Sequence, residues 1–102
     1  MISFTILYPF GPDKKFDWDY YLPHHMEKIK QGLGPKLLHY HLEKGLAGSG
    51  ENTPPAFFAI LHLLVESMAE VKDIADMAPV MMADIPNYTD VKPIMQISES
   101  IE

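Results

Sequence analysis

Cysteine is absent from this sequence of 102 residues, so the chain has neither a disulfide framework nor a thiol nucleophile. Basic residues are also few: 8 lysines and arginines stand against 14 aspartates and glutamates, which gives a formal net charge of −6 at pH 7. No local basic cluster offsets this excess, and an acidic surface repels phosphate backbones and anionic lipid headgroups. We therefore expect no nucleic acid and no membrane among its partners.

Long apolar runs and the common catalytic motifs are missing as well. The longest apolar run, around residues 56–65, contains His62 and is too short to cross a bilayer. The first residues lack the basic and apolar segments of a secretory signal. There is no glycine-rich phosphate loop, no serine-centred nucleophile motif and no dinucleotide fingerprint. We expect a soluble cytoplasmic protein that uses no cofactor.

Hydrophobic periodicity indicates strands and helices in alternation within a single domain, residues 1–102. The predicted strands are residues 2–8, 36–46, 56–66 and 91–99, with a loop at residues 47–55. Asp17 caps the first predicted helix, and Ser67 with Glu70 forms a capping box for the second. This βαββαβ order predicts an α+β, ferredoxin-like fold, with a four-stranded antiparallel sheet and two helices on one face.

Two prolines interrupt the predicted helices. Pro23 lies deep in the first helix and predicts a kink or a new helix start, because proline removes a backbone donor. Pro79 fits the first position of a further short turn that ends near Met82. The inward face of the first helix is predicted to carry Trp18, Leu22, His25 and Ile29.

Apolar residues occur on both faces of the central strands, although two helices can cover only one face. The uncovered set includes Leu7, Phe58, Ile60 and Leu64. Soluble monomers rarely expose a large apolar patch. We therefore predict a homodimer formed sheet against sheet.

His25 is the first candidate for chemistry, with Tyr21 one helical turn before it. Such a pair can share a proton with a ligand held between helix and sheet. A core histidine bonded to a backbone carbonyl is the plainer alternative, and the sequence alone favours it. His24 faces the other way, toward solvent.

Three more histidines gather on the predicted central hairpin. If the hairpin turns at Glu51-Asn52, His41 lies opposite His62, and His39 shares their face. Three imidazoles on one face could ligate a metal ion, but no carboxylate or thiolate has an obvious place beside them. We expect no metal site and favour polar packing near the sheet edge.

Methionines are frequent in the second predicted helix and around it. They are Met68, Met77, Met81, Met82 and Met95. They could line an adaptable apolar pocket or simply fill the core. Tyr88, in the turn before the last strand, either points into the space between helix and sheet or packs that turn.

The C-terminal part of the chain carries the most distinctive pattern. The run DIPNYTD at residues 84–90, followed by Pro93 and by QISE at residues 96–99, resembles the C-terminal signature of the EthD family. That family is named for a small protein of ethyl tert-butyl ether degradation. Further matches are Tyr8-Pro9, Phe16-Asp17 with Tyr20-Tyr21, His25-Met26 and Gly45-Leu46-Ala47-Gly48. The resemblance covers essentially the whole chain and implies a dimeric α/β barrel, with His25 as the family's histidine of the first helix.

The resemblance also sets the functional expectation. EthD proteins often accompany oxygenase systems, and their superfamily includes cofactor-free monooxygenases, isomerases and haem-dependent enzymes. We expect a homodimer that binds a small apolar or aromatic molecule in a degradative or oxygenase-associated pathway, as a cofactor-free oxygenase or isomerase. His25 would act as general base or acid, with Tyr21 orienting the ligand. The expected ligand contacts are Trp18, Tyr88 and Met82. The alternative is a non-catalytic ligand carrier or an accessory subunit of an oxygenase system.

Overall fold

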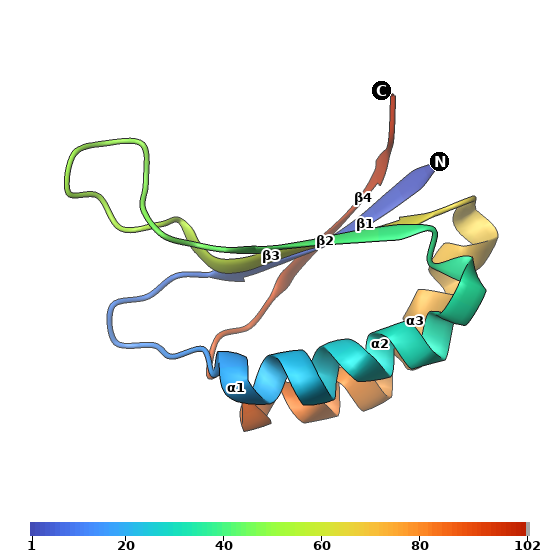
Figure 1. The fold of residues 1–102 in the computed structure, drawn as a ribbon, viewed down its shortest axis with the longest axis horizontal. Coiled ribbons are helices and arrows are strands. Elements are labelled where there is room, and N and C mark those ends of the chain that lie inside the picture. The colour runs from blue at the N-terminus through green and yellow to red at the C-terminus, as the bar shows by residue number, and fades with distance from the viewer. Residues whose placement is uncertain (102) are drawn as a thin grey trace.

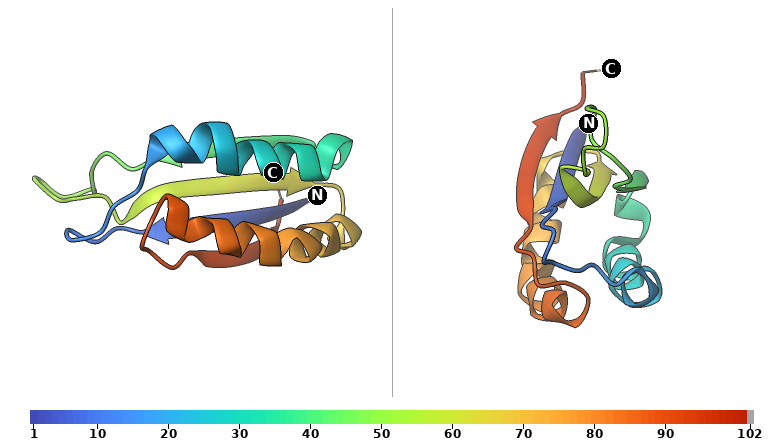
Figure 2. Two further views of the ribbon diagram at one scale, coloured as in Figure 1. Left: turned by 90° about the horizontal axis from the view of Figure 1, so that it is seen from below. Right: turned by 90° about the vertical axis from the view of Figure 1, so that its left-hand side faces the viewer.

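A computed structural model describes residues 1–101 and contains one four-stranded sheet with helices beneath it (Figure 1). The strands are β1 (Ile2–Pro9), β2 (His39–Lys44), β3 (Phe57–Val65) and β4 (Ile94–Glu99), in the spatial order β2-β3-β1-β4. All three pairings are antiparallel. The helices are α1 (Trp18–Tyr20), the π-helical turn η1 (Tyr21–Met26), α2 (Glu27–Leu33) and α3 (Met68–Asp84). Figure 2 shows the helices on one face of the sheet, so the predicted ferredoxin-like arrangement is confirmed.

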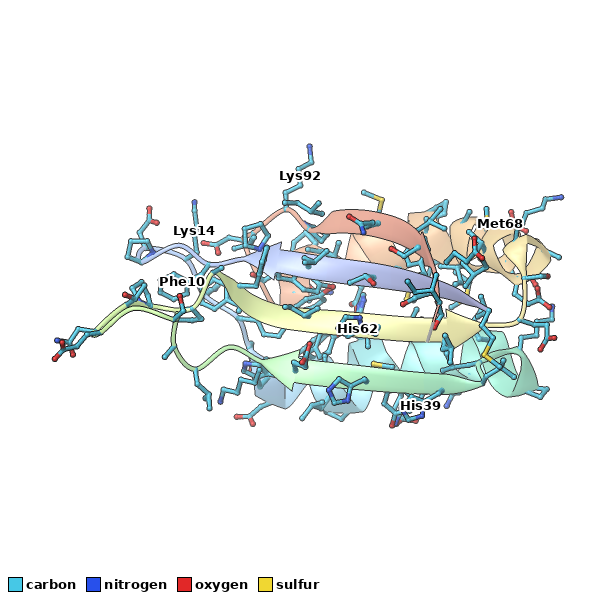
Figure 3. All side chains as sticks on the ribbon, turned by 90° about the horizontal axis from the view of Figure 1, so that it is seen from above. Phe10, Lys14, His39, His62, Met68 and Lys92 are labelled. Carbon is cyan, nitrogen blue, oxygen red and sulfur yellow. The ribbon has the colours of Figure 1, made fainter. Side chains whose placement is uncertain are left out.

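The sheet buries one face and leaves the other open. On β1, Phe4, Ile6 and Tyr8 point toward the helices and are buried. The opposite face carries Leu7 beside Ile60 and Thr5 beside His62, because residues directly opposite in an antiparallel pair share a face. These open-face side chains are half-buried, and Figure 3 looks directly onto them with no helix in front.

The first helical segment does not break at Pro23. Residues 21–26 form a π-helical turn, and the backbone stays right-handed helical from Tyr20 into α2. A π turn is wider than an α turn, so it tolerates the missing amide of proline and shifts the side chains around the axis. The predicted inward position of Leu22 is therefore wrong: its exposed fraction is 48%, while Tyr21, His25 and Met26 are buried.

The second long helix also runs through its proline. The predicted cap is present, since Ser67 Oγ accepts from the Ala69 amide at 3.3 Å and donates to Glu70 Oε2 at 2.6 Å. The expected end before Pro79 is wrong, because α3 continues to Asp84. Pro79 is exposed, and Met77 and Met81 on either side of it pack against the core. This packing compensates for the lost hydrogen bond and carries the end of α3 to the candidate site.

Two strands begin three residues later than expected. The second was predicted from residue 36, but Gly34–Lys36 forms a 3₁₀ turn (η2), and β2 begins at His39. The last was predicted from residue 91, and β4 begins at Ile94, just after Pro93, which has no amide hydrogen to give to a ladder. A second 3₁₀ turn, η3 (Ile85–Asn87), joins α3 to the segment before β4. None of the helices in residues 1–101 is long and apolar enough to cross a bilayer.

Candidate functional site

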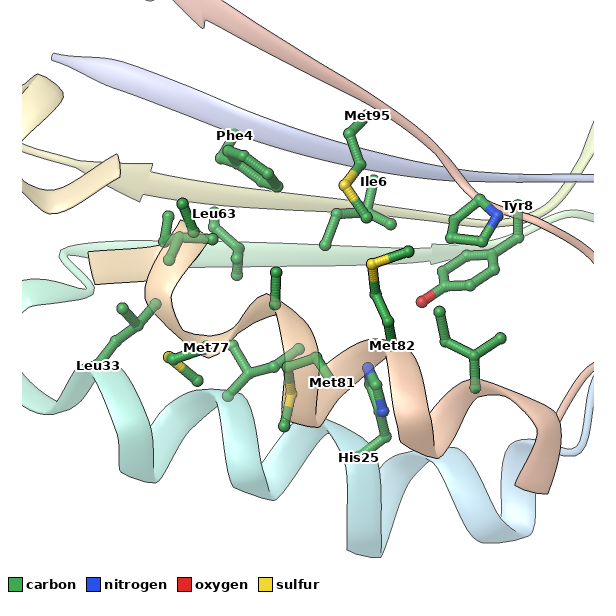
Figure 4. Close-up of a pocket in the computed structure, with 16 residues that line it drawn as sticks. Phe4, Ile6, Tyr8, His25, Leu33, Leu63, Met77, Met81, Met82 and Met95 are labelled. Atoms are coloured by element: carbon green, nitrogen blue, oxygen red, sulfur yellow. The ribbon is translucent and has the colours of Figure 1, made fainter. Parts of the chain in front are cut away.

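A cavity of about 190 Å³ lies between the sheet and the helices (Figure 4). Its walls come from the strands above and from α2 and α3 below, and they are almost wholly apolar. Representative lining residues are Phe4, Ile6, Leu63, Met77, Met81 and Met95. A dry apolar cavity of about 150 Å³ is large enough to hold benzene. This space therefore suits a single aromatic ring or an aliphatic molecule of similar size.

His25 lines the cavity, and its imidazole can titrate near neutral pH. It projects from η1 and is 2% exposed. Its Nδ1 lies 3.0 Å from Oδ2 of Asp84, the last residue of α3, and its Nε2 lies 3.3 Å from the Tyr88 hydroxyl. Both ring nitrogens are thus bonded to side chains rather than to a backbone carbonyl. The plain core-histidine interpretation described the burial correctly but not the partners.

Asp84 is buried and accepts from several donors. The Tyr20 hydroxyl donates to Oδ1 at 2.6 Å and the Asn87 amide donates to the same oxygen at 3.0 Å, while the ammonium of Lys28 lies 3.6 Å away. Burial by itself raises the pKa of Asp84, but hydrogen bonds from Tyr20, Asn87 and His25 together with the charge of Lys28 outweigh it. The net result is a pKa well below the usual range. The carboxylate is therefore ionised at neutral pH.

The charge of Asp84 fixes the tautomer of His25. An ionised carboxylate can only accept, so Nδ1 carries the hydrogen and Nε2 is left to accept from the Tyr88 hydroxyl. The Tyr88 oxygen in turn lies 2.8 Å from the Tyr8 hydroxyl. Burial lowers the pKa of His25, and the pairing with Asp84 only partly offsets this effect. The resting site is a neutral imidazole beside a carboxylate, which is the form required of a general base.

Aromatic rings surround this network, and burial raises the pKa values of Tyr8, Tyr21 and Tyr88, so all three stay neutral. Tyr21 stacks on His25 with ring centres 5.3 Å apart, and its hydroxyl has no hydrogen-bond partner of ordinary geometry among residues 1–101. Trp18 packs on Phe16, with ring centres 4.6 Å apart. Of the four further predicted residues, Met82 lines the cavity. Tyr21 and Tyr88 contact His25 without lining the cavity, and Trp18 lies one layer further out, against Tyr21. Their roles toward a ligand stay predictions.

The same fold occurs in solved structures. An EthD-like protein from Ralstonia eutropha JMP134 has a TM-score of 0.90 and 36% sequence identity to this chain, over 99% of this chain and 92% of that one. The chain belongs to the EthD-like family. A protein from Arabidopsis thaliana shares the fold alone, with a TM-score of 0.58 and 16% identity over 100% and 97% of the two chains. No protein-family model matches the sequence, and no curated protein matches it.

The residues of this site that went unrecognised as functional in the sequence include Asp84, Tyr8 and Tyr20. Asp84 stands at the C-terminal end of α3, where the helix dipole disfavours a negative charge. An acidic residue at such a position is a usable signal that hydrogen-bond donors or a cation elsewhere in the fold offset its charge. Tyr8 and Tyr20 offered no comparable signal, because tyrosines in a strand and a helix commonly serve packing alone.

The histidines of the EthD-like chain's open sheet face form a separate cluster. His41 lies opposite His62 as the hairpin register required, with ring centres 6.1 Å apart. Glu43 lies between them, 3.0 Å from His62 Nε2 and 3.6 Å from His41 Nε2. Within residues 1–101, no group of three or more histidine, cysteine or acidic side chains is placed to hold a metal ion.

Proposed function

We propose that this EthD-like protein binds a small, largely apolar molecule in the cavity between sheet and helices, and that His25 transfers a proton to or from it. One observation carries the proposal: a neutral, buried histidine in an apolar cavity wall is held by an ionised carboxylate. When the imidazole takes up a proton, Asp84 stabilises the charge that develops on the ring. Strongly perturbed titratable groups beside a cavity are typical of functional sites.

The chemistry that fits this arrangement begins with removal of a proton from a carbon beside a carbonyl group. His25 accepts the proton at Nε2, and Tyr88 turns its hydroxyl from Nε2 to the oxygen of the resulting enolate. Return of the proton to a different carbon completes an isomerisation. Reaction of the same carbanion with dioxygen as co-reactant is the corresponding oxygenation. Tyr21 keeps the imidazole plane in place by stacking on it, and Met82 contacts the ligand.

The proposal includes a homodimer formed through the open face of the sheet. The half-buried Leu7, Ile60 and Leu64 lie on this face with no helix to cover them. A second copy would remove them from water. We place the protein in the cytoplasm, in a degradative or oxygenase-associated pathway.

The alternative function is that of a ligand carrier or an accessory subunit of an oxygenase system. A specific feature favours it: both ring nitrogens of His25 already have partners within the protein, and nearly all other cavity walls are apolar. Such a cavity can hold a hydrocarbon without acting on it. Binding without turnover is the property that separates the two functions.

Acetophenone in D₂O tests both functions, because exchange of its methyl hydrogens reports proton abstraction without knowledge of the natural product. We expect the wild-type protein to accelerate the exchange, His25→Gln to abolish the acceleration, and His24→Gln, its exposed neighbour, to retain it. Methyl NMR of the methionines lining the cavity measures binding in the same samples. Saturable binding with no exchange in the wild type would favour the carrier. Equal exchange by wild type and His25→Gln would exclude His25 as the base.

A further inference from the structure

A surface groove continues from one end of the cavity. Three residues line both spaces: Met82 and Ile85 from the end of α3 and the start of η3, and Pro93 from the segment before β4. The groove's remaining walls include Lys15, Asp90 and Lys92. A molecule seated in the cavity can therefore extend past Met82 into a charged groove.

Polarity rises along this path. In Figure 4, Phe4, Leu33 and Leu63 lie at one end of the cavity, and Tyr8, Met82 and His25 lie toward the other. The groove begins at this second end, since Met82, Ile85 and Pro93 are shared. An occupant thus meets apolar walls first, then the imidazole, and finally ionised groups.

The charged residues of the groove favour binding of an anion. Among residues 1–101, the six ion pairs include neither Lys15 nor Lys92, so neither ammonium group is in direct contact with a carboxylate. Asp90 also lines the groove, but its Oδ1 accepts from the backbone amide of Lys15 at 3.1 Å. That hydrogen bond, aided by the charges of Lys14 and Lys15, lowers the pKa of Asp90. Figure 3 shows Lys14 and Lys92 projecting toward the same side of the molecule.

This location is unusual for a chain whose net charge is −6. The overall charge repels anions, so an anionic ligand gains only where lysines outnumber acids locally. The groove lining has two lysines and one aspartate. A single negative charge neutralises this balance, whereas a dianion would leave the groove with a net negative charge beside Asp90.

We propose that the ligand of the cavity is amphiphilic: its apolar part fills the cavity, its reactive group lies beside His25, and a monoanionic group, a carboxylate, lies in the groove between Lys15 and Lys92. This inference rests on the proposed function and names its substrate class. The lysines hold and orient the ligand and take no part in proton transfer.

A matched pair of probes isolates the charge. 3-Phenylpropionate and 3-phenylpropionamide have nearly the same shape and differ in one negative charge, and methionine methyl NMR measures their affinities. Exposed pairs between lysine and carboxylate are individually weak, so the wild type should bind the carboxylate about three- to tenfold more tightly than the amide at low salt. The preference should shrink as ionic strength rises toward 1 M.

Two double variants locate the effect. Lys15→Gln with Lys92→Gln should remove the preference for the carboxylate and leave the affinity for the amide unchanged. Lys36→Gln with Lys72→Gln changes the net charge equally, away from the groove, and should keep the preference. Equal affinity of both probes for the wild type would overturn the anionic subsite while leaving the cavity proposal standing. Failure of both probes to bind at millimolar concentration would overturn the cavity proposal and this inference with it.

Discussion

Two histidine–carboxylate pairs lie on opposite sides of the same sheet, and their nitrogen–oxygen distances are equal. His25 Nδ1 is 3.0 Å from Asp84 on the helix side, and His62 Nε2 is 3.0 Å from Glu43 on the open face. The side chains of the buried pair are 3% and 5% exposed, whereas those of the open-face pair are 40% and 48% exposed. Distance alone therefore does not distinguish a candidate site from a surface contact.

The difference lies in what solvates each charge. On the open face, water screens the attraction and can replace either partner. On the helix side, the protein itself must solvate Asp84, and Tyr20 and Asn87 supply those hydrogen bonds. Such an arrangement is costly to build, so it indicates a role beyond simple pairing.

Removal of the carboxylate should affect stability very differently in the two pairs, and this is the largest effect that we expect. We expect Asp84→Ala to lower the free energy of unfolding by about 3–5 kcal/mol, because it leaves buried donors without an acceptor. We expect Glu43→Ala to lower it by less than about 1 kcal/mol. Urea unfolding followed by circular dichroism measures both. Similar losses in the two variants would mean that burial does not determine how much each pair contributes to the free energy of unfolding.

Much of the fold follows from local patterns in the sequence. Alternation predicted the four strands, and the spacing of the central hairpin placed His41 opposite His62. The cap at Ser67 was readable because its chemistry spans only four residues. Each of these features depends on neighbours in sequence or on one turn.

The candidate site was only half predictable, because it depends on packing between distant segments. His25 stood out through its position on the first helix, but its partner Asp84 is 59 residues away. That partner reaches the site only because α3 continues through Pro79. The π turn around Pro23 likewise decides that His25 and Met26 point inward while Leu22 does not. Proline's local cost predicted an interruption in each helix, but α3 continues through Pro79 because tertiary contacts compensate for the lost hydrogen bond.

A charge on the open face tests whether that face is an interface. Ile60→Glu places a carboxylate opposite Glu43 and beside Leu7. If two copies meet there, the dissociation constant of the dimer should rise about 100-fold, because an unpaired charge would be buried. Sedimentation equilibrium measures this constant.

Leu22→Glu is the matched control, since Leu22 is an exposed leucine on the helix side. It should leave the association unchanged. A wild-type protein that is monomeric at micromolar concentration would remove the sheet-to-sheet dimer altogether.

The pH dependence of stability should report the buried histidine. Burial lowers the pKa of His25 in the folded protein below its ordinary value of 6.5, so folding favours the neutral ring. Its contribution to stability is present above about pH 6.5 and is lost as pH falls through the folded-state pKa. We expect the free energy of unfolding to decline between pH 7 and 5, and this decline to be shallower in His25→Gln.

NMR of ¹³C-labelled histidines gives the direct measurement. The ring of His25 should titrate below pH 6.5, and His24→Gln should preserve the pH profile of stability. A midpoint above 6.5 would show that Asp84 outweighs burial and that the resting site is an ion pair.

The smallest expected effect concerns Gly32 of α2, which lies next to the cavity-lining Met77. A Cβ added there would clash with Cε of Met77, which lines the cavity and also a groove between α2 and α3. The end of a methionine side chain moves easily, so Gly32→Ala should push it into the cavity rather than disrupt the fold. We expect toluene to bind a few-fold more weakly. Stability should change by no more than about 1 kcal/mol, since better helix propensity offsets the repacking.

Gln31→Ala is the matched control, because Gln31 is the exposed neighbour of Gly32 and its side chain does not line the cavity. It should leave the affinity for toluene unchanged. A crystal structure of Gly32→Ala with toluene would show whether Met77 has moved inward. If the affinity is unchanged and Met77 is displaced toward solvent, the groove between α2 and α3, rather than the cavity, takes up the added methyl group. In that case the packing around Met77 would be more deformable than the packing around the buried pair of His25 and Asp84.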